Sequence, residues 1–232
     1  MQLHYSAIIL MGGTGKRALS PLPKQFHLLG NKPIYQHTLA TFQDSKLFKE
    51  IILVSHFDWV SKVKEEVSSW PHVKVVPGGE TRQASCAKGL EACSSSCAYA
   101  MIHDAVRPFV SIEILKKNSE AVLKSDAVDT CIISSDTIIM TEDGRWINSI
   151  PLRSQFYRGQ TPQTFSYPLI CKAHKETPLE NASDDCQLVM DLGIPVAMVE
   201  GSEENFKITT EWDLKIAQAW VELGRLHTSK QN

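Results

Sequence analysis

Residues 6–25 read SAIILMGGTGKRALSPLPKQ, an apolar run that leads directly into a glycine-rich loop. The run has the length and the β-branched content of a buried strand. Glycine has no Cβ, so the backbone N–H groups of such a loop can close around a phosphate group. The stretch therefore predicts a strand followed by an anion-binding loop.

The same alternation of a short apolar run and a longer amphipathic segment recurs along the chain. Strands are expected at residues 6–10, 50–55, 73–76, 98–103, 128–133 and 194–200, and helices at residues 33–42, 59–67, 82–93 and 112–125. Strands that alternate with helices favour a parallel sheet, because parallel strands need crossover connections. We predict an α/β fold with a Rossmann-like, open, mostly parallel sheet, whose ligands gather beyond the carboxyl ends of the strands.

One segment breaks this alternation. Residues 136–165 contain TIIM, a turn at EDGR and then WINSI, which is the pattern of a β-hairpin with Asp143-Gly144 in the turn. An isolated two-stranded ribbon has too little apolar surface to be stable alone. We therefore expect a single domain of residues 1–232 that carries a protruding β-hairpin arm at 136–160, packed against a second subunit.

The composition excludes several classes of function. The chain is 43% hydrophobic with a net charge of -2, which suits a globular domain and argues against broad nucleic-acid binding. The five apolar residues before the glycines are too few for a membrane span or a signal peptide. The six cysteines show no CxxC pair and no paired zinc spacing. We expect a cytoplasmic protein with reduced thiols, and neither a membrane nor a nucleic acid as partner.

Two familiar phosphate-binding signatures nearly match the glycine-rich loop, but neither fits. A P-loop would need a glycine at Leu10 and a hydroxyl group at Arg17. The dinucleotide fingerprint GxGxxA is matched at residues 13–18 and would indicate an NAD-dependent oxidoreductase, but the prolines of SPLP (20–23) interrupt the helix that it requires. The remaining interpretation is a stiff loop that brings Arg17 and Lys24 to a polyphosphate.

Two further polar motifs follow expected strands. In PGGETRQAS (77–85) the glycines allow close approach of a base, and Ser85 either hydrogen-bonds that base or caps the next helix. In HDAVRP (103–108) Asp104 stands at the carboxyl end of a strand, where a carboxylate can bind Mg²⁺. The alternative there is a structural pair of Asp104 with Arg107.

Taken together, these motifs resemble those of the sugar-alcohol phosphate cytidylyltransferases. The matching stretches occur in order over almost the whole chain: GGTGKR, KQ, GGETRQAS, HDAVRP, DT, IPLRSQFYRGQTPQTF, ASDD and GSEENFKITTEWDL. The resemblance implies a nucleotidyltransferase type of α/β fold and a reaction of CTP with a polyol phosphate that releases pyrophosphate. FSYPLICKAH and VEGSEENFKIT favour members that use 2-C-methyl-D-erythritol 4-phosphate, in non-mevalonate isoprenoid biosynthesis, whereas PLRSQFYRGQTPQ also fits members that use D-ribitol 5-phosphate.

The resemblance also implies roles for individual residues. The catalytic residues would be Arg17, Lys24 and Lys207. The CTP-binding residues would be Gly12, Gly13, Thr14, Gly15, Gly79, Arg82, Ser85, Asp104 and Ala105. The acceptor-binding residues would be Thr137, Arg153, Ser183 and Arg107. Asp104 would also bind Mg²⁺, and a homodimer formed through the arm leaves open whether Thr137 and Arg153 serve their own subunit or its partner.

The implied reaction explains these residue types. The acceptor phosphate attacks the α-phosphorus of CTP in line, so the protein must position both substrates and neutralise negative charge rather than supply a nucleophile. His103 lies beside Asp104 and is a conceivable general base. The attacking phosphate is already ionised at neutral pH, however, so we expect His103 to be structural.

Overall fold

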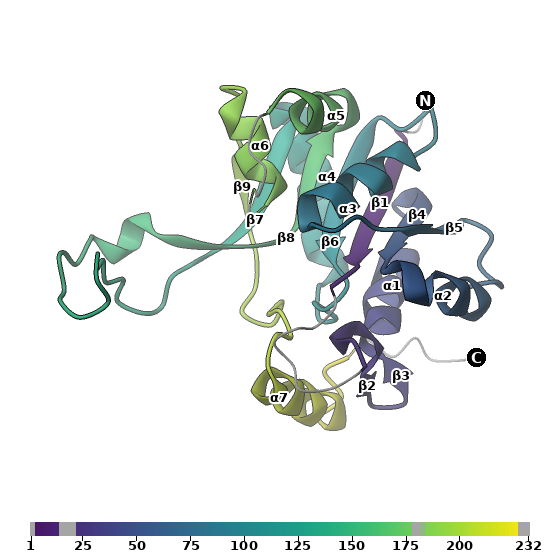
Figure 1. The fold of residues 1–232 in the computed structure, drawn as a ribbon, viewed down its shortest axis with the longest axis horizontal. Helices are drawn as coiled ribbons and strands as arrows, with labels where there is room; N and C mark the ends of the chain where they lie inside the picture. Colours follow the sequence, from purple (N-terminus) through teal and green to yellow (C-terminus); the bar gives the residue numbers. More distant parts are fainter. Residues whose placement is uncertain (1–2, 14–21, 178–181, 183, 227–232) are drawn as a thin grey trace.

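A seven-stranded sheet with helices on both faces forms the centre of the protein in a computed structural model (Figure 1). The structure describes residues 3–13, 22–177, 182 and 184–226. Four of the predicted site residues lie outside the described residues: Thr14, Gly15, Arg17 and Ser183.

The sheet is open and mostly parallel, which confirms the predicted fold class. In the order in which they pair, its strands are β5 (Val73–Pro77), β4 (Phe48–Ser55), β1 (Tyr5–Met11), β6 (Tyr99–Asp104), β8 (Tyr157–Ser166), β7 (Ala127–Ile133) and β9 (Ala197–Glu200). Neighbouring strands run parallel, except that β8 pairs in the antiparallel direction with both β6 and β7. A separate antiparallel pair is formed by β2 (Leu28–Leu29) and β3 (Lys32–Pro33).

All six predicted strands form, and the largest shift in their bounds is at β9. This strand begins at Ala197 instead of residue 194. Pro195 lies in the difference, and its ring nitrogen has no N–H group to donate to the hydrogen-bond ladder with β7. The strand therefore starts after the proline.

The helices cover the two faces of the sheet. The α-helices are α1 (Ile34–Asp44), α2 (Val60–Glu66), α3 (Arg82–Glu91), α4 (Ile112–Ser125), α5 (Tyr167–Glu176), α6 (Asp185–Asp191) and α7 (Glu211–Glu222), and the 3₁₀ turns are η1 (Lys24–Phe26), η2 (Phe57–Trp59) and η3 (Arg153–Gln155). Apolar side chains of α1, α2 and α4 share one buried core, and those of α3, α5 and α6 share another. The predicted helices correspond to α1 to α4, while α7 packs beside β2. Among the described residues, no helix has both the length and the apolar character needed to cross a membrane.

Strand β8 does not follow from the sequence pattern, because most of its buried side chains are polar. Gln160, Thr161, Gln163 and Thr164 are all at most 5% exposed. Their hydrogen-bonding groups are paired within the fold, for example in the donation from Gln163 Nε2 to Asp129 Oδ1 at 3.0 Å. A strand of this kind lacks the apolar alternation on which recognition from sequence depends.

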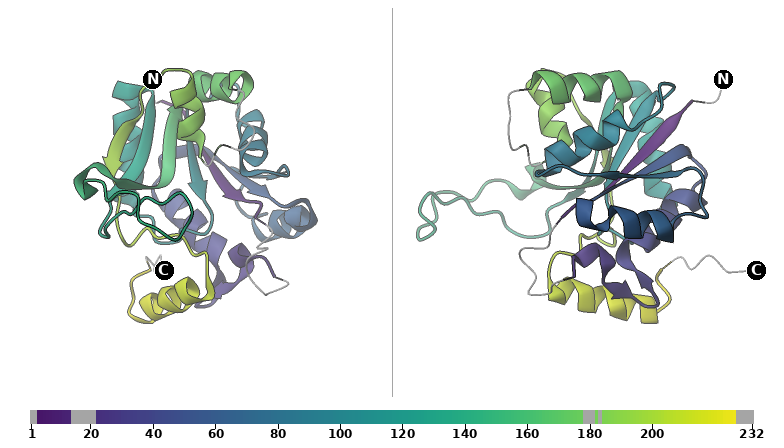
Figure 2. Two further views of the ribbon diagram at one scale, coloured as in Figure 1. Left: turned by 60° about the vertical axis from the view of Figure 1, so that its left-hand side comes forward. Right: turned by 45° about the vertical axis from the view of Figure 1, so that its right-hand side comes forward.

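The predicted arm is present, but its two predicted strands are not. Residues 134–156 leave the body between β7 and β8 and extend far beyond the sheet (Figures 1 and 2). TIIM and WINSI pair only through a bridge between Met140 and Ser149. The turn lies where Asp143-Gly144 predicted it, with φ of Gly144 at 71°. A ribbon with so little surface to bury does not sustain a full ladder within one chain.

The bounds of the arm also differ from the predicted 136–160. Tyr157 already pairs with Ile133, so residues 157–160 belong to β8 and to the body of the protein. The arm carries large apolar side chains that are each more than half exposed: Ile139, Met140, Trp146, Ile147, Ile150 and Leu152. Contiguous exposed apolar surface of this kind is typical of an interaction surface.

The packing of α3 on the sheet depends on the absence of a side chain at Gly89. A Cβ atom there would lie 2.5 Å from Cγ2 of Ile8 and 3.0 Å from Cγ2 of Val54. Alanine normally stabilises a helix interior by about 1 kcal/mol relative to glycine, but overpacking a core costs about 1–3 kcal/mol. We expect Gly89→Ala to lower the free energy of unfolding in urea, whereas Lys88→Ala on the exposed face changes it little. A stabilised Gly89→Ala protein would contradict this packing.

The buried carboxylate of Glu50 makes stability depend on pH. Burial raises its pKa, but hydrogen bonds from Lys74 Nζ (2.6 Å), Ser94 N (2.8 Å) and Ser6 Oγ (2.7 Å) outweigh burial and lower the pKa to about 2. The unfolded chain therefore binds a proton at higher pH than the native protein does, and this contribution is lost as pH falls from about 4.5 towards 2. We expect Glu50→Gln to be less stable than wild type at pH 7 by about 1–3 kcal/mol.

The same substitution should flatten the acid limb of the stability curve. Denaturant unfolding of both proteins between pH 7 and pH 3 measures this, because the difference between them should shrink below about pH 4.5, where Glu50 of the unfolded wild-type chain becomes protonated. A difference that stays constant over this range would show that Glu50 does not titrate as its contacts indicate.

Candidate active site

The carboxyl ends of four parallel strands meet at one edge of the sheet. Met11 at the end of β1 is in register with Ser55 at the end of β4, and Ser55 is in register with Pro77 at the end of β5. On the other side of β1, Leu10 is in register with Asp104, the last residue of β6. The predicted motifs therefore lie beside one another, as expected for an open α/β sheet.

The glycine-rich loop is tied to the segment that carries Lys24. The side-chain amide of Gln25 donates to the carbonyl of Met11 at 2.6 Å and to that of Gly13 at 3.2 Å. Gln25 is 3% exposed and belongs to the short turn η1, which begins at Lys24 directly after Pro23. The residue next to Lys24 is thus anchored on the glycines, which fixes the backbone at Lys24 beside the loop.

The second glycine loop lies against the first. Ser85 Oγ accepts from Gly79 N at 3.1 Å and donates to Gly79 O at 3.2 Å. A Cβ on Gly12 would lie 3.4 Å from the same Ser85 Oγ, and one on Gly79 would lie 2.5 Å from Cβ of Ala84. Gly79 thus packs on α3 more closely than a residue with a Cβ could, whereas Gly12 lies at ordinary contact distance from Ser85.

The alternative role for Ser85 as a helix cap is wrong. The N-terminal cap of α3 is Thr81, whose Oγ1 accepts from Ala84 N at 3.0 Å. Ser85 lies one turn into the helix. Its hydroxyl group bonds to the backbone of Gly79 in the preceding loop and not to a backbone N–H group in the first turn of α3. Its position is that of a residue that shapes the loop of Gly79.

Asp104 is the centre of a buried cluster of charges. Its Oδ2 atom lies 3.0 Å from Nζ of Lys207 and 3.3 Å from Nε of Arg107. Burial raises the pKa of this carboxyl, but the charges of Lys207, Arg107 and Arg82 outweigh it and hold the pKa well below its usual range. The carboxylate therefore stays ionised, while Lys207 remains 41% exposed and accessible to a ligand.

The structural pair of Asp104 with Arg107 is confirmed, but it does not account for the whole cluster. Arg107 also donates from Nη1 to the carbonyl of Asn205 at 2.8 Å. Asn205 donates from Nδ2 to Thr161 O at 2.8 Å, and Ile208 N donates to Val106 O at 2.9 Å. These bonds hold the backbone on both sides of Lys207 against the body. The lysine is therefore placed by a rigid bracket rather than by a loose loop.

His103 is structural, as expected. The carbonyl of Arg107 can only accept, so His103 Nε2 donates to it at 3.3 Å, and Nδ1 of the neutral ring accepts from Thr161 Oγ1 at 3.0 Å; Thr161 Oγ1 also accepts from Asp104 N at 3.1 Å. Burial lowers the pKa of His103 to about 3. A neutral, fully buried imidazole with both nitrogens in use cannot serve as a general base for a substrate.

Two further predicted residues, Ala105 and Arg82, lie directly after β6 and at the start of α3. Ala105 N donates to Leu10 O at 3.0 Å, and its carbonyl accepts from Thr38 Oγ1 at 2.8 Å, so β6 is pinned to β1 where the loop begins. Arg82 begins α3, and its Nη1 atom lies 2.7 Å from Oδ2 of Asp185. Asp185 was not among the predicted site residues.

Thr137 and Arg153 are not brought to the cluster within one chain. Both are exposed residues of the arm, and Arg153 Nη1 donates to Ser135 O at 2.9 Å, also on the arm. Figure 1 shows that the arm extends sideways from the end of β7, out beyond the body of the protein. The structure therefore unites the predicted nucleotide residues of the body, but not these two acceptor residues.

Four residues that support the site were not among the predicted site residues: Gln25, Thr161, Asp185 and Asn205. Each acts through hydrogen bonds to a residue distant in the chain, such as the donation from Gln25 to the carbonyl of Met11. All four do stand inside quoted motifs (KQ, IPLRSQFYRGQTPQTF, ASDD and GSEENFKITTEWDL), so their presence there was the available clue. Nothing in a single sequence pairs them with their partners.

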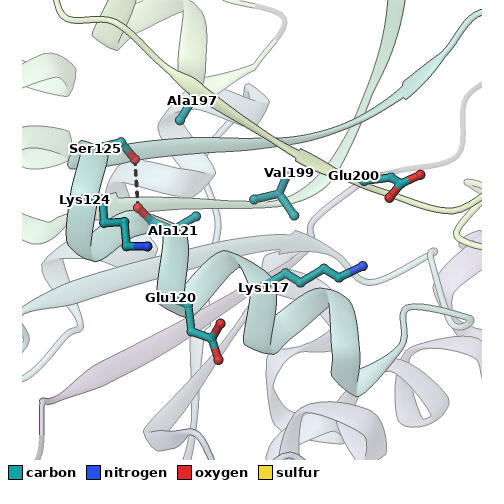
Figure 3. Close-up of a pocket in the computed structure, with 8 residues that line it drawn as sticks. All are labelled: Lys117, Glu120, Ala121, Lys124, Ser125, Ala197, Val199 and Glu200. Atoms are coloured by element: carbon teal, nitrogen blue, oxygen red, sulfur yellow. Dashed lines mark hydrogen bonds between the residues drawn. The ribbon is translucent and has the colours of Figure 1, made fainter.

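A shallow hollow elsewhere does not belong to this site. It lies between α4 and β9, with Lys117, Glu120 and Lys124 on the helix and Val199 and Glu200 on the strand (Figure 3). Charges of both signs line it, and none of its residues takes part in the cluster around Asp104. The candidate active site is therefore the edge formed by the ends of β1, β4, β5 and β6.

The protein is an α/β nucleotidyltransferase. It has the open sheet of this class, with two glycine loops and a cluster of cations around Asp104 at the ends of the strands. The family model of 2-C-methyl-D-erythritol 4-phosphate cytidylyltransferase (IspD) matches residues 5–223. The chain belongs to this family. An NAD-dependent oxidoreductase, the remote alternative raised by the glycine loop, is thereby excluded.

Solved structures give the same result. The chain is similar to 4-diphosphocytidyl-2C-methyl-D-erythritol synthase from Anaerococcus prevotii, with a TM-score of 0.85, 31% identity, and coverage of 96% of this chain and 100% of that one. It is also similar to 2-C-methyl-D-erythritol 4-phosphate cytidylyltransferase from Thermus thermophilus, with a TM-score of 0.77, 33% identity and coverage of 95% and 100%. The Francisella tularensis cytidylyltransferase of the same name has a TM-score of 0.79, 27% identity and coverage of 93% and 99%.

Proposed function

We propose that the protein transfers the cytidylyl group of CTP to 2-C-methyl-D-erythritol 4-phosphate, giving 4-diphosphocytidyl-2-C-methyl-D-erythritol and pyrophosphate. Membership of the family over residues 5–223 carries this proposal. The pairing of Lys207 with Asp104 beside the glycine loops supports it, because cations placed at the strand ends suit a triphosphate.

CTP binds in this proposal between the two glycine loops. Gly12, Gly13 and Ala105 flank the triphosphate, together with Thr14 and Gly15, which lie outside the described residues. Gly79 and Ser85 form the pocket for the base, and their mutual hydrogen bonds keep the backbone of that loop in a fixed position for recognition.

Catalysis consists of positioning and of charge neutralisation. The phosphate of the acceptor attacks the α-phosphorus of CTP, the bond to the bridging oxygen of the β-phosphate breaks, and pyrophosphate leaves with the electron pair. Lys24, Lys207 and Arg17 stabilise the negative charge that spreads over the phosphoryl oxygens. The bracket around Lys207 supports this role, because a stabilising cation is most effective when it needs no reorganisation.

Asp104 is the proposed magnesium ligand, and the residues present fit the ion. Mg²⁺ is commonly bound by one or two carboxylates together with substrate phosphates. Among the described residues, both ion pairs of Asp104 use Oδ2, which leaves Oδ1 as the ligand atom. When bound, the ion would neutralise charge on the phosphate oxygens.

The acceptor site is proposed to be completed by a second subunit. Thr137 and Arg153 are assigned to the acceptor together with Arg107 and Ser183, of which Ser183 lies outside the described residues. The exposed apolar side chains of residues 134–156 support a homodimer formed through the arm, since such a surface requires a partner to cover it. We also propose a cytoplasmic location, supported by the absence of a disulfide at any of the six cysteines.

The function is tested by pyrophosphate release from CTP with 2-C-methyl-D-erythritol 4-phosphate and, in parallel, with D-ribitol 5-phosphate. We expect kcat/KM to favour the first acceptor by at least about a hundredfold, which corresponds to about 3 kcal/mol. A preference for ribitol phosphate would show that the proposed acceptor is wrong, and it would leave the proposed CTP site unchanged. Absence of release with either acceptor would overturn the proposed function.

A further inference from the structure

We propose that Asp185 and His174 are positioning residues that hold the guanidinium group of Arg82 for recognition of CTP. This inference rests on the proposed function, because Arg82 is assigned to the nucleotide. Neither Asp185 nor His174 is expected to touch a substrate. Their effect is exerted on the orientation of Arg82.

The contact between Arg82 and Asp185 joins an accessible cation to a buried anion. Nη1 of Arg82 lies 2.7 Å from Oδ2 of Asp185, and the side chains are 26% and 1% exposed. A pair with one buried partner is held more firmly than a pair on the surface, because water competes less for the carboxylate. Arg82 is thus anchored from behind while part of it still faces solvent.

The carboxylate of Asp185 is itself fixed by other elements. Its Oδ1 atom lies 3.0 Å from Nε2 of His174 on α5, whose side chain is 6% exposed. Its backbone N–H group donates to Gln163 Oε1 on β8 at 3.3 Å. Asp185 is the first residue of α6, while Arg82 is the first residue of α3. Four elements of the fold therefore determine where one guanidinium group lies.

The charge of Arg82 reaches the active site. It helps to hold the pKa of Asp104 well below its usual range, while its direct ion pair is with Asp185. Within the part of the chain that the structure describes, the hydrogen bond of Arg82 to a side chain uses Nη1. Nη2 and Nε face no such partner there, and a guanidinium fork is suited to phosphate or carbonyl oxygens. Asp185 thus holds one end of the guanidinium group and leaves the other nitrogens for a ligand.

The same residues do not form a metal site. Cys86, His174 and Asp185 place potential ligand atoms within 4.8 Å of one another. However, Oδ2 of Asp185 is already paired with Arg82, and burial raises the pKa of the Cys86 thiol. A metal ion would need a thiolate there and would stand beside a fixed positive charge. The arrangement instead suits support of the arginine.

The test is a double-mutant cycle on the affinity for CTP, measured by titration calorimetry with the full-length protein. We expect Arg82→Ala and Asp185→Asn each to weaken CTP binding by tenfold or more. If Asp185 acts through Arg82, the double variant binds CTP no more weakly than Arg82→Ala alone. A purely structural role would give multiplied losses instead, and that result would overturn the inference.

A milder pair of variants covers the case in which Asp185→Asn does not fold. His174→Gln retains a side-chain N–H donor and should bind CTP within about twofold of wild type, whereas His174→Ala should bind severalfold more weakly. Equal CTP affinities of these two variants would contradict the inference. Glu91→Gln is the matched control, because it removes the exposed pair with Lys88 on α3 and should leave CTP affinity unchanged.

The outcomes for this inference and for the proposed function differ. If the wild-type protein neither binds CTP nor releases pyrophosphate, the proposed function is wrong, and so is the inference that rests on it. If the wild-type protein binds CTP but the losses of CTP affinity in Arg82→Ala and Asp185→Asn multiply in the double variant, only the inference is wrong. The KM for the acceptor provides a second readout, and it should stay within about threefold of wild type in Asp185→Asn.

Discussion

Replacement of Lys207 by alanine lowers kcat by two to three orders of magnitude, the usual scale for loss of one preorganised electrostatic stabiliser. Lys207 lies 3.0 Å from the buried carboxylate of Asp104 and is still 41% exposed, so it can exchange this contact for a phosphate oxygen. The measurement is steady-state pyrophosphate release at saturating CTP and acceptor. Activity within threefold of wild type would exclude Lys207 from the catalytic machinery.

Two further variants separate the charge of Lys207 from its contribution to folding. Lys215→Ala removes an exposed lysine from α7 and should leave kcat unchanged. Lys207→Arg keeps the positive charge beside Asp104 and should retain more activity than Lys207→Ala. Thermal unfolding of all three variants checks that the protein remains folded. A lower melting temperature in Lys207→Ala without a lower kcat would indicate a structural role only.

Arg153→Ala raises the KM for the acceptor by tenfold or more and leaves the KM for CTP within about threefold. Loss of a charge-assisted contact to phosphate gives an effect of this size. Arg153 lies on the arm and, in one chain, its guanidinium group contacts only Ser135 among the described residues. Arg145→Ala at the tip of the arm is the matched control. Equal increases in both KM values would remove Arg153 from the acceptor site.

Mixing Lys207→Ala with Arg153→Ala, assayed at an acceptor concentration far below the KM of Arg153→Ala so that both variants are nearly inactive, tests which subunit uses Arg153. A dimer of one Lys207→Ala chain and one Arg153→Ala chain has one intact site if the arm serves the partner subunit, and none if it serves its own. Random exchange should then restore about one quarter of wild-type activity, since half of the dimers are mixed and one of their two sites is intact. Absence of recovery in mixtures shown to exchange subunits would place Arg153 in its own subunit's site.

The sequence was sufficient to predict those parts of the fold in which apolar periodicity reports burial. Strand β1 and the helices of the first half follow from such runs, and Asp104 lies at the end of β6 as expected. Strand β8 could not be found this way, because most of its buried residues are glutamines and threonines whose partners are distant in the chain. Polar burial depends on specific pairs, and the pairs are properties of the folded structure.

The residues of the candidate site also differ in how far the sequence could predict them. Gly12 and Gly79 stand in glycine motifs whose residue types indicate a nucleotide site, and Lys207 was found through the resemblance to the family. Asp185 stands in the ASDD motif, but its role comes from a contact with Arg82 that spans more than a hundred residues. The arm was expected to pair as a hairpin, and it forms one bridge because local turn geometry alone does not bury a ribbon.

Asp104 acts as a counter-ion within the protein itself. Lys207 and Arg107 both contact its Oδ2 atom, and Arg82 lies near enough to shift its pKa. Without this carboxylate the three cations would repel one another across a poorly solvated region, and the empty site would spread apart. The carboxylate of Asp104 therefore keeps the cations close together in the empty site, where a bound triphosphate can then pair with them.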